Sequence, residues 1–578
     1  MRSSCLTDGK RAVNEHRYIA NPAVSISRGI PLAEEQGLGA LTLGGFLQDV
    51  VQRFGAHEAL VHRNEDGRVE RWTYEDLWNR SMAVAKALIA DGLGKGERVG
   101  VLMTNRPEFL TSVFGAALAG GVAAPISTFS TAAELAYLLE LSAVSTLLLE
   151  RSVLKKDFLE TLCELDPRIG RDPQEPFASE VFPFLRSLAM VGEGARGAMQ
   201  TWQGFLERGA GLADDRVARR AAAVSPADPG ALFFSSGSTA RPKGILSAHR
   251  GVALQMWRMG PQQGLADGVR SWTANGFFWS GNFSMIVGGT LACGGTIVLQ
   301  RTFHPAEALE MMEAERVNFL FAWPHQWEQL IGAPNWEKAD LSALVYVDAS
   351  SPIARHPKVN SSWIEPRHCY GNTETFTLST AYPAQTSREE AGDSHGLPLP
   401  GNIIKIVEPQ SGRALPVGER GELAVKGPTL MLGYLGVPLA DTLDEEGFFR
   451  TGDGGWLDSE GRLHWEGRLN DIIKTGGANV SPLEIDDVIC ECPQVKMVQT
   501  IGVPHHTLGE MVVSCIVLHD GAHLDEKSVQ SWAKEKLASY KVPRRVLFFG
   551  SADLQLTGSA KIKTADLRAL AAKKLEST

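Results

Sequence analysis

Residues 231–244 read ALFFSSGSTARPKG, and this stretch decides how the rest of the chain is interpreted. The apolar run from Ala231 to Phe234 predicts a buried strand, and a loop rich in serine, threonine and glycine follows it. Small residues let backbone N–H groups converge on phosphate oxygens, hydroxyls add donors, and Lys243 adds a positive charge. The GxxxxGK[ST] spacing of a Walker loop is absent. A flexible surface loop has a similar composition, but the order SSGSTxxPKG directly after an apolar strand favours a phosphate-binding loop.

The length and charge of the chain limit the classes of protein that it could be. Its 578 residues exceed the roughly 250–300 at which a single hydrophobic core stops growing, so at least two domains are expected. With 57 basic and 67 acidic side chains, the formal net charge is −10, which argues against a protein that acts mainly on nucleic acid. A local group of amides and lysines can still bind a small anion.

No segment predicts secretion or a membrane span. Residues 1–37 lack the apolar core of a signal peptide. The stretch Phe109–Ile126 is apolar but rich in glycine and alanine and contains Pro125, which favours a buried helix followed by a strand. The odd number of cysteines, seven, without a CxxC pair, indicates reduced thiols. We therefore expect a protein of the cytoplasm.

The first two thirds of the chain alternate between helical and extended patterns. Thr73 and Asp76 form a capping-box pattern ahead of apolar positions at helical spacing. Short apolar or β-branched runs at Arg98–Met103 and Thr146–Leu149 alternate with further helical segments. This alternation favours an α/β architecture with a largely parallel sheet.

The pattern changes near the C-terminus. Strands are expected around Val495–Val503, Met511–Leu518 and Arg545–Phe549, with a helix near Glu526–Leu537. A segment of this length suits a small independent domain. We predict a flexible lead over residues 1–40, a large domain over 41–469, and a small domain over 470–578.

Four further motifs follow the loop in order: YGNTE at 370–374, FRTGD at 449–453, GR at 467–468, and LTGSAKI at 556–562. Together with SSGSTxxPKG they resemble the motifs of the adenylate-forming superfamily, which comprises acyl-CoA synthetases, peptide-synthetase adenylation domains and luciferases. The resemblance covers roughly residues 42–570. It implies a large α/β domain of layered subdomains with parallel sheets and a β-barrel-like part, and a small mobile α+β domain that acts as a lid.

The resemblance assigns roles to the residues of these motifs. Tyr370 would stack on adenine, Thr373 would bond the α-phosphate, Glu374 would hold Mg²⁺, and Asp453 would accept both ribose hydroxyls. The nucleotide-binding set that it implies is Ser235, Ser236, Gly237, Ser238, Thr239, Lys243, Ser350, Tyr370, Gly371, Asn372, Thr373, Asp453 and Arg468.

The small domain would supply the rest of the machinery. Lys561 resembles the adenylation lysine, and Asn470 occupies the hinge position. Gly476 and Gly477 resemble the loop that lines the pantetheine tunnel of CoA. The implied catalytic residues are Lys561, Thr373, Glu374 and Lys243. A solvated run of lysines is the alternative for the C-terminal tail.

An aromatic segment, NGFFWSGNF at 275–283, would line the acid pocket, with Trp279, Asn282 and Phe283 as contacts and Trp323 from a later stretch. No acidic residue occurs from Asn275 to Leu291 to pair an α-ammonium group, which argues against amino-acid substrates. A hydrophobic carboxylic acid fits better, and fatty, aryl, terpenoid and polyketide acids stay open. An aromatic core strand is the alternative for this segment.

The sequence therefore predicts an ATP- and Mg²⁺-dependent acid–CoA ligase that forms an acyl-adenylate, releases pyrophosphate and makes a thioester. Departures from the family pattern at Ala240, Asn470 and Ala560 keep a second hypothesis open, in which the acyl group passes to the phosphopantetheine of a carrier protein or the adenylate to a partner enzyme. A nucleotide sensor without turnover is the third. A homodimer stays open, and neither nucleic acid nor a membrane span is expected.

Overall fold

The computed structural model describes residues 24–64, 66–171, 177–235, 242–366, 368–469, 471, 473–475, 478–505, 508–537, 541–550 and 564–576. The chain divides into two compact units. The first is built mainly from residues 28–403 and 425–449, and the second mainly from residues 404–424 and 450–578. No helix of the described residues is long and apolar enough to cross a bilayer.

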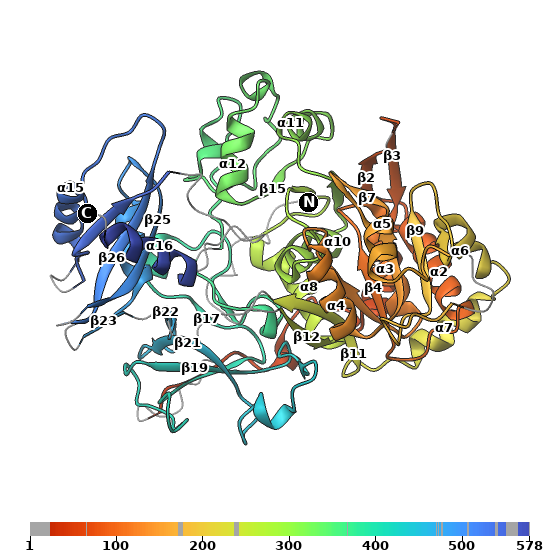
Figure 1. Ribbon diagram of the computed structural model, residues 1–578, viewed down its shortest axis with the longest axis horizontal. Helices are drawn as coiled ribbons and strands as arrows, with labels where there is room; N and C mark the ends of the chain where they lie inside the picture. Colours follow the sequence, from red (N-terminus) through yellow and green to blue (C-terminus); the bar gives the residue numbers. More distant parts are fainter. Residues whose placement is uncertain are drawn as a thin grey trace, which may run out of the picture. The chain divides into compact units, whose positions relative to one another are not determined.

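The first unit contains an eight-stranded sheet whose strands run parallel except at one end (Figure 1). Its order is β10 (Met199–Thr201), β9 (Ser187–Val191), β6 (Val144–Glu150), β4 (Arg98–Leu102), β5 (Val122–Pro125), β11 (Pro229–Ser235), β12 (Lys243–Ala248) and β20 (Gly433–Tyr434). The two pairs at the β20 end are antiparallel. The predicted parallel α/β architecture is confirmed, and the predicted strand before the phosphate loop is β11.

A second sheet of the same unit has five strands, and only its last pair is antiparallel. Its order is β15 (Phe319–Phe321), β13 (Arg270–Thr273), β14 (Thr296–Leu299), β2 (Glu58–Arg63) and β3 (Val69–Thr73). The expected capping box forms at the start of α2 (Tyr74–Ala90), where Thr73 and Asp76 bond each other's backbone. The stretch Phe109–Ile126 is a buried helix and strand, as predicted.

The helices of the first unit connect and cover these strands (Figure 1). Besides α2 they are α1 (Leu43–Phe54), α3 (Pro107–Leu118), α4 (Ala132–Ser142), α5 (Phe158–Leu165), α6 (Trp202–Arg208), α7 (Asp214–Ala222), α8 (His249–Gln263), α9 (Ser280–Asn282), α10 (Gly289–Ala292), α11 (Pro305–Ala314), α12 (Pro324–Ile331) and α13 (Arg388–Ala391). The main core joins apolar side chains of α1, α2, α3 and α8 to those of the sheets.

A third sheet corresponds to the β-barrel-like part. Its order is β1 (Ile26–Arg28), β18 (Ile403–Val407), β19 (Gly421–Lys426), β21 (Phe449–Leu457) and β22 (Leu463–Arg468). The predicted flexible lead over 1–40 stays a prediction, and its residues 1–23 lie outside the described residues. Residues 26–28 are the edge strand of this sheet, and the guanidinium of Arg258 makes two hydrogen bonds of 2.8 Å to the Glu35 carboxylate.

The small C-terminal domain has the expected strands and helix. Its sheet runs β24 (Ala478–Val480), β23 (Ile473–Thr475), β26 (Gly509–Leu518) and β25 (Val495–His505), with β27 (Arg545–Phe548) paired to β26. Alternate side chains of β26 enter two separate cores. The helices α14 (Pro482–Cys490) and α15 (Glu526–Lys536) belong to one core, and α16 (Thr564–Glu576) to the other. The predicted boundary at Asn470 lies outside the described residues and stays a prediction.

One buried carboxyl makes the stability of this domain depend on pH. Burial raises the pKa of Asp486 from 3.8 to about 7, although its side chain accepts a 2.7 Å hydrogen bond from the Thr500 amide. Between about pH 4 and pH 7 the folded domain therefore keeps a proton that the unfolded chain has lost. The free energy of unfolding must fall as the pH rises through this window, and the whole cost is present above it.

We expect Asp486→Asn to stabilise the full chain most at pH 8, to stabilise it less at pH 5, and to leave its stability nearly unchanged below about pH 4. The amide keeps the acceptor for Thr500 and carries no charge. Since one pKa unit corresponds to about 1.4 kcal/mol, the gain at pH 8 should be of the order of a few kcal/mol. Urea unfolding of both proteins across this range measures it. An equal difference at pH 5 and pH 8 would contradict the assignment.

Candidate functional site

The predicted phosphate loop joins two antiparallel strands. Ser235 ends β11 and Lys243 begins β12, and these two residues are cross-strand partners. The loop residues Ser236, Gly237, Ser238 and Thr239 lie outside the described residues, so their assignment stays a prediction. The strand pairing nevertheless brings Ser235 next to Lys243 at the base of the loop.

Lys243 and Glu374 converge on a tyrosine that the sequence analysis did not identify. The Lys243 ammonium lies 4.8 Å from the centre of the Tyr434 ring, a cation–π contact. The hydroxyl of Tyr434 donates a 2.7 Å hydrogen bond to the Glu374 carboxylate. Tyr434 belongs to β20, which pairs with β12 at the end of the large sheet. Its local sequence gives no signal of this role, because only the sheet order places it between the two motifs.

The turn that contains Glu374 is fixed by backbone geometry. A Cβ on Gly371 would lie 1.7 Å from the carbonyl oxygen of Thr377, so only glycine fits there. The Asn372 side chain accepts a 3.0 Å hydrogen bond from the Thr375 amide and caps the 3₁₀ turn Thr373–Thr375. Asn372 thus positions Thr373 and Glu374 through the turn that it caps.

The residues after this turn adopt an unusual backbone. Phe376 and Thr377 both have positive φ, at 46° and 90°, a region that costs energy for residues other than glycine. The surroundings hold this conformation. Phe376 is fully buried, and the Thr377 hydroxyl lies 2.8 Å from that of Ser284. Strained backbone maintained directly beside predicted site residues is typical of functional sites.

Three buried phenylalanines connect the predicted phosphate, acid and YGNTE segments. The ring of Phe233, in β11, lies 5.4 Å from the ring of Phe376 and 6.0 Å from that of Phe283. All three are at most 1% exposed. Phe283 is therefore a core residue that links the acid segment to β11, and a contact between its side chain and an acid stays a prediction.

The aromatic segment forms a turn that leads into a short helix, and it is not a strand. Asn275 follows β13, α9 covers Ser280–Asn282, and a π-helix covers Phe283–Gly288. The alternative of an aromatic core strand is therefore wrong. A short apolar run cannot by itself distinguish a strand from a buried helix.

The predicted acid contacts differ in their surroundings. Trp279 precedes α9, is partly buried, and packs at 5.3 Å against Phe278. Asn282 is 3% exposed, and its side chain bonds the main chain of the same segment. Trp323 begins α12, is 45% exposed, and packs against Phe321. Their contact with a substrate stays a prediction.

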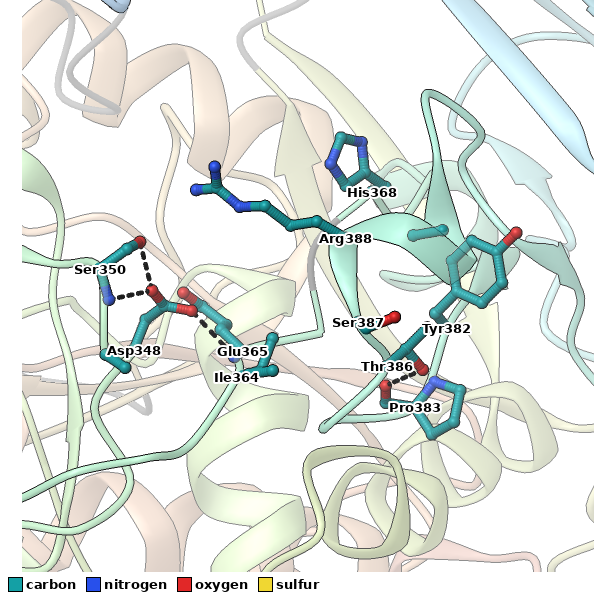
Figure 2. Close-up of a pocket in the computed structure, with 12 residues that line it drawn as sticks. Asp348, Ser350, Ile364, Glu365, His368, Tyr382, Pro383, Thr386, Ser387 and Arg388 are labelled. Carbon is teal, nitrogen blue, oxygen red and sulfur yellow. Dashed lines mark hydrogen bonds between the residues drawn. The ribbon is translucent and has the colours of Figure 1, made fainter. Parts of the chain in front are cut away.

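A cavity of about 300 Å³ lies beside the predicted nucleotide contact Ser350 (Figure 2). The Ser350 amide and hydroxyl both donate to the Asp348 carboxylate, at 2.8 and 2.5 Å. The second carboxylate oxygen of Asp348 accepts a 3.0 Å hydrogen bond from the Glu365 amide. Figure 2 shows this bonded group on one side of the cavity and Tyr382, with the loop after it, on the other.

Tyr370 is close in sequence to a residue that lines this cavity. It is 3% exposed, and its backbone bridges to that of Thr380. His368, two residues earlier, lines the cavity and has a positive φ of 54°. The sequence analysis did not single out His368, and its proximity to the YG pair is the signal that could have identified it.

The two predicted ribose contacts lie together in the second unit. Asp453 and Arg468 are cross-strand partners in β21 and β22. The Arg468 Nε lies 3.1 Å from a carboxylate oxygen of Asp453, and its Nη1 donates a 2.8 Å hydrogen bond to the Thr451 carbonyl. Asp453 is 3% exposed, whereas the Arg468 side chain is half exposed. Arg468 thus orients and neutralises a buried carboxylate.

The remaining predicted site residues lie outside the described part of the chain. These are Asn470 at the predicted hinge, Gly476 and Gly477 of the predicted tunnel loop, and Lys561. Their roles stay predictions from the sequence.

Two family models match the chain. The AMP-binding enzyme model matches residues 47–435, and the AMP-binding enzyme C-terminal domain model matches residues 484–561. The chain is 30% identical to the acyl-CoA ligase SID4 of Ajellomyces capsulatus, over 93% of this chain and 92% of the relative. It is also 30% identical to a feruloyl-CoA synthase of Amycolatopsis sp., over 86% and 93%.

Solved structures share the fold. ATP-bound MatB from Rhodopseudomonas palustris superposes with a TM-score of 0.71 at 24% identity, covering 91% of this chain and 98% of that one. The o-succinylbenzoate CoA synthetase of Bacillus subtilis gives a TM-score of 0.67 at 22% identity, with 90% and 97% covered. The order of the motifs, the fold and these matches agree, and the chain belongs to the AMP-binding enzymes of the adenylate-forming superfamily, in the family of AMP-forming acyl-CoA ligases.

Proposed function

We propose that this protein activates a hydrophobic carboxylic acid other than an amino acid. The acid attacks the α-phosphate of ATP, pyrophosphate leaves, and the acyl-adenylate then reacts with the thiol of CoA to give a thioester and AMP. The observation that carries the proposal is the convergence of Lys243 and Glu374 on Tyr434, at the base of the phosphate loop.

The difficulty of the first step is electrostatic, because a carboxylate must approach a phosphate that is already negative. Catalysis therefore consists of positioning and charge stabilisation rather than covalent chemistry by the protein. Lys243, fixed over the Tyr434 ring at the start of β12, would bind a phosphate oxygen of the nucleotide. The hydroxyl of Thr373 would donate to the α-phosphate.

The site fits a magnesium ion bound mainly by the nucleotide. Mg²⁺ prefers oxygen ligands and, in nucleotide sites, often takes one or two carboxylates together with substrate phosphates and waters. Glu374 supplies one carboxylate, and the hydroxyl of Tyr434 fixes its orientation. A carboxylate has about four lone-pair positions, so this hydrogen bond leaves room for a metal. Magnesium bound there would neutralise charge on the departing pyrophosphate.

We assign the nucleotide base to the cavity beside Ser350, and on the resemblance of its motif alone we assign Asp453 to the ribose. The cavity volume of about 300 Å³ is at the lower end of the range for ligand pockets. The two oxygens of Asp453 suit a pair of vicinal hydroxyls, and the Arg468 guanidinium lies 3.1 Å from one of them and orients the carboxylate. The thiol step is assigned to the CoA tunnel loop at Gly476 and Gly477, on the resemblance of its sequence.

The nature of the acid follows from the absence of charge on the segment that would hold it. No acidic residue occurs between Asn275 and Leu291, and Phe277 and Phe278 are at most 5% exposed. Burying an ammonium group without a partner costs several kcal/mol, so an α-amino acid is disfavoured. An apolar acid gains from the aromatic surroundings.

A screen of carboxylic acids for AMP release, with and without CoA, tests the proposal. We expect apolar acids to drive ATP–pyrophosphate exchange and CoA to be converted to the thioester, whereas amino acids should be inactive. Exchange without thioester formation would redirect the second step to a carrier protein or partner enzyme. A lack of exchange with every acid would contradict the proposed activity and favour a nucleotide sensor.

A further inference from the structure

Three polar side chains fix the main chain of Asn275, the first residue of the aromatic segment. Its carbonyl oxygen accepts two side-chain amides, from Asn105 at 2.7 Å and from Asn282 at 2.6 Å. Its own N–H donates to the Thr273 hydroxyl at 3.1 Å. The Asn105 side chain also accepts a 2.9 Å hydrogen bond from the Phe277 amide. Side chains, rather than strand pairing, thus set the position of this segment.

Asn105 is itself held rigidly. Its neighbours Thr104 and Arg106 both bind Glu150, a carboxylate at the end of β6 that is 1% exposed. The Thr104 hydroxyl donates at 2.7 Å, and the Arg106 guanidinium lies at 3.0 Å. Buried, charge-assisted bonds of this kind fix a loop strongly. The side-chain amide of Asn105 thereby connects the large sheet to the aromatic segment.

The side chain of Asn275 is in a different situation. Asn275 is 6% exposed, and its side-chain Nδ2 has no hydrogen-bond partner in the described part of the chain. Leaving a buried donor unsatisfied costs about 1–3 kcal/mol, and native structures rarely keep such a group without a partner. The fold therefore orients this residue with three hydrogen bonds to its main chain and leaves its side-chain amide donor unused.

We propose that the Asn275 amide is a specificity-determining donor that binds an oxygen on the body of the acid substrate. The inference rests on the proposed function, because the aromatic segment is the acid site only if the protein activates acids. It narrows the substrate class to carboxylic acids whose otherwise apolar body carries an acceptor oxygen, such as a keto or ether oxygen. Asn105 and Asn282 are positioning residues that hold Asn275.

The surroundings of Asn275 fit such a substrate. Phe277 packs against Phe109 at 5.6 Å, and Phe278 packs edge-on against Phe129 at 5.8 Å, so the neighbouring side chains are apolar. A single neutral donor among aromatic rings selects for an acceptor on an apolar body. Sites that hydrogen-bond a substrate group discriminate strongly against analogues without it, because their own polar group is then left unpaired.

Acid-dependent ATP–pyrophosphate exchange with matched acids tests the inference. The probes are octanoic acid and oxooctanoic acids with the keto group at different carbons, together with cinnamic acid and its methoxy derivatives. For the wild type we expect kcat/KM of at least one oxygen-bearing acid to exceed that of its plain partner about tenfold or more. Asn275→Leu should reduce this ratio towards one, with the KM for ATP unchanged.

Two further variants separate recognition from folding. Asn275→Asp keeps the volume, lacks the amide donor at neutral pH, and should lose the same preference. Asn335→Leu is the control, because Asn335 is another asparagine with one unpartnered side-chain atom, Oδ1, and its Nδ2 donates to the Ala306 carbonyl outside the aromatic segment. It should leave the preference intact. Thermal unfolding of each variant shows whether it is folded.

The outcomes are distinct. The inference is wrong if the wild type shows exchange but prefers plain acids throughout, or if Asn275→Leu lowers kcat/KM equally for all acids. The amide then binds a water or has a structural role. If no acid supports exchange with the wild type, the proposed function fails first. Loss of the oxygen preference in both Asn275 variants, with the preference kept in the control, supports the inference.

Discussion

Replacing Glu374 with glutamine is expected to lower the rate of acid-dependent ATP–pyrophosphate exchange by about 10²–10³-fold. The amide can still accept the hydrogen bond of Tyr434, so the turn keeps its geometry, but the negative charge that would bind magnesium is gone. We also expect the variant to need a higher Mg²⁺ concentration for half-maximal exchange. Initial rates of exchange across a magnesium series measure both effects.

Tyr434→Phe is the matched control for this prediction. It keeps the charge of Glu374 and the ring beneath Lys243, and removes only the hydroxyl that donates to the carboxylate. The substitution should lower the exchange rate about tenfold or less. A hydrogen bond to a charged group contributes about 1.5–3 kcal/mol, and water can replace part of it. Exchange by Glu374→Gln within threefold of the wild type would rule out a metal role for this carboxylate.

Lys561→Ala is expected to abolish activation of the acid by ATP, with a loss of about 10³-fold or more, and to leave thioester formation from a preformed acyl-adenylate within a few fold of the wild type. A cation is needed to bridge the acid carboxylate and the α-phosphate, which repel each other. Once the adenylate exists, this repulsion has been overcome. Exchange assays and thioester formation from synthetic acyl-adenylate measure the two half-reactions separately.

Lys563→Ala is the control, because Lys563 lies two residues away in the same lysine-containing tail. A solvated lysine run predicts that both variants behave alike, whereas a catalytic lysine predicts that only Lys561→Ala loses activation. Equal loss in both half-reactions would contradict the division of roles between activation and thioester formation.

The parts of the fold that local chemistry controls could be predicted from the sequence. The capping box at Thr73 and Asp76 forms because the two side chains and backbone amides are within one turn of each other. The strand before the phosphate loop and the strands of the small domain follow from runs of apolar residues. These patterns need no information from distant residues.

At two places the structure depends on tertiary contacts that local patterns do not show. Residues 26–28 lie in a polar stretch, yet they form an edge strand because the third sheet offers them backbone partners. The aromatic segment begins as a turn rather than a strand, and there the Asn105 side chain bonds the backbone of Asn275 and Phe277. Neither partner is near in sequence, so no local pattern could have shown the outcome.

The sequence alone determined which chemical groups are available and in which order: a strand, a serine-rich loop with Lys243, the YGNTE motif with Glu374, and a carboxylate at Asp453. Only the tertiary structure decided which groups meet. Tyr434 reaches both Lys243 and Glu374 because β20 is added to the sheet beside β12. Asn275 is oriented by the side-chain amide of Asn105, 170 residues earlier in the chain. The physical reason is that motifs record neighbours along the chain, whereas hydrogen bonds between distant residues depend on strand order and packing.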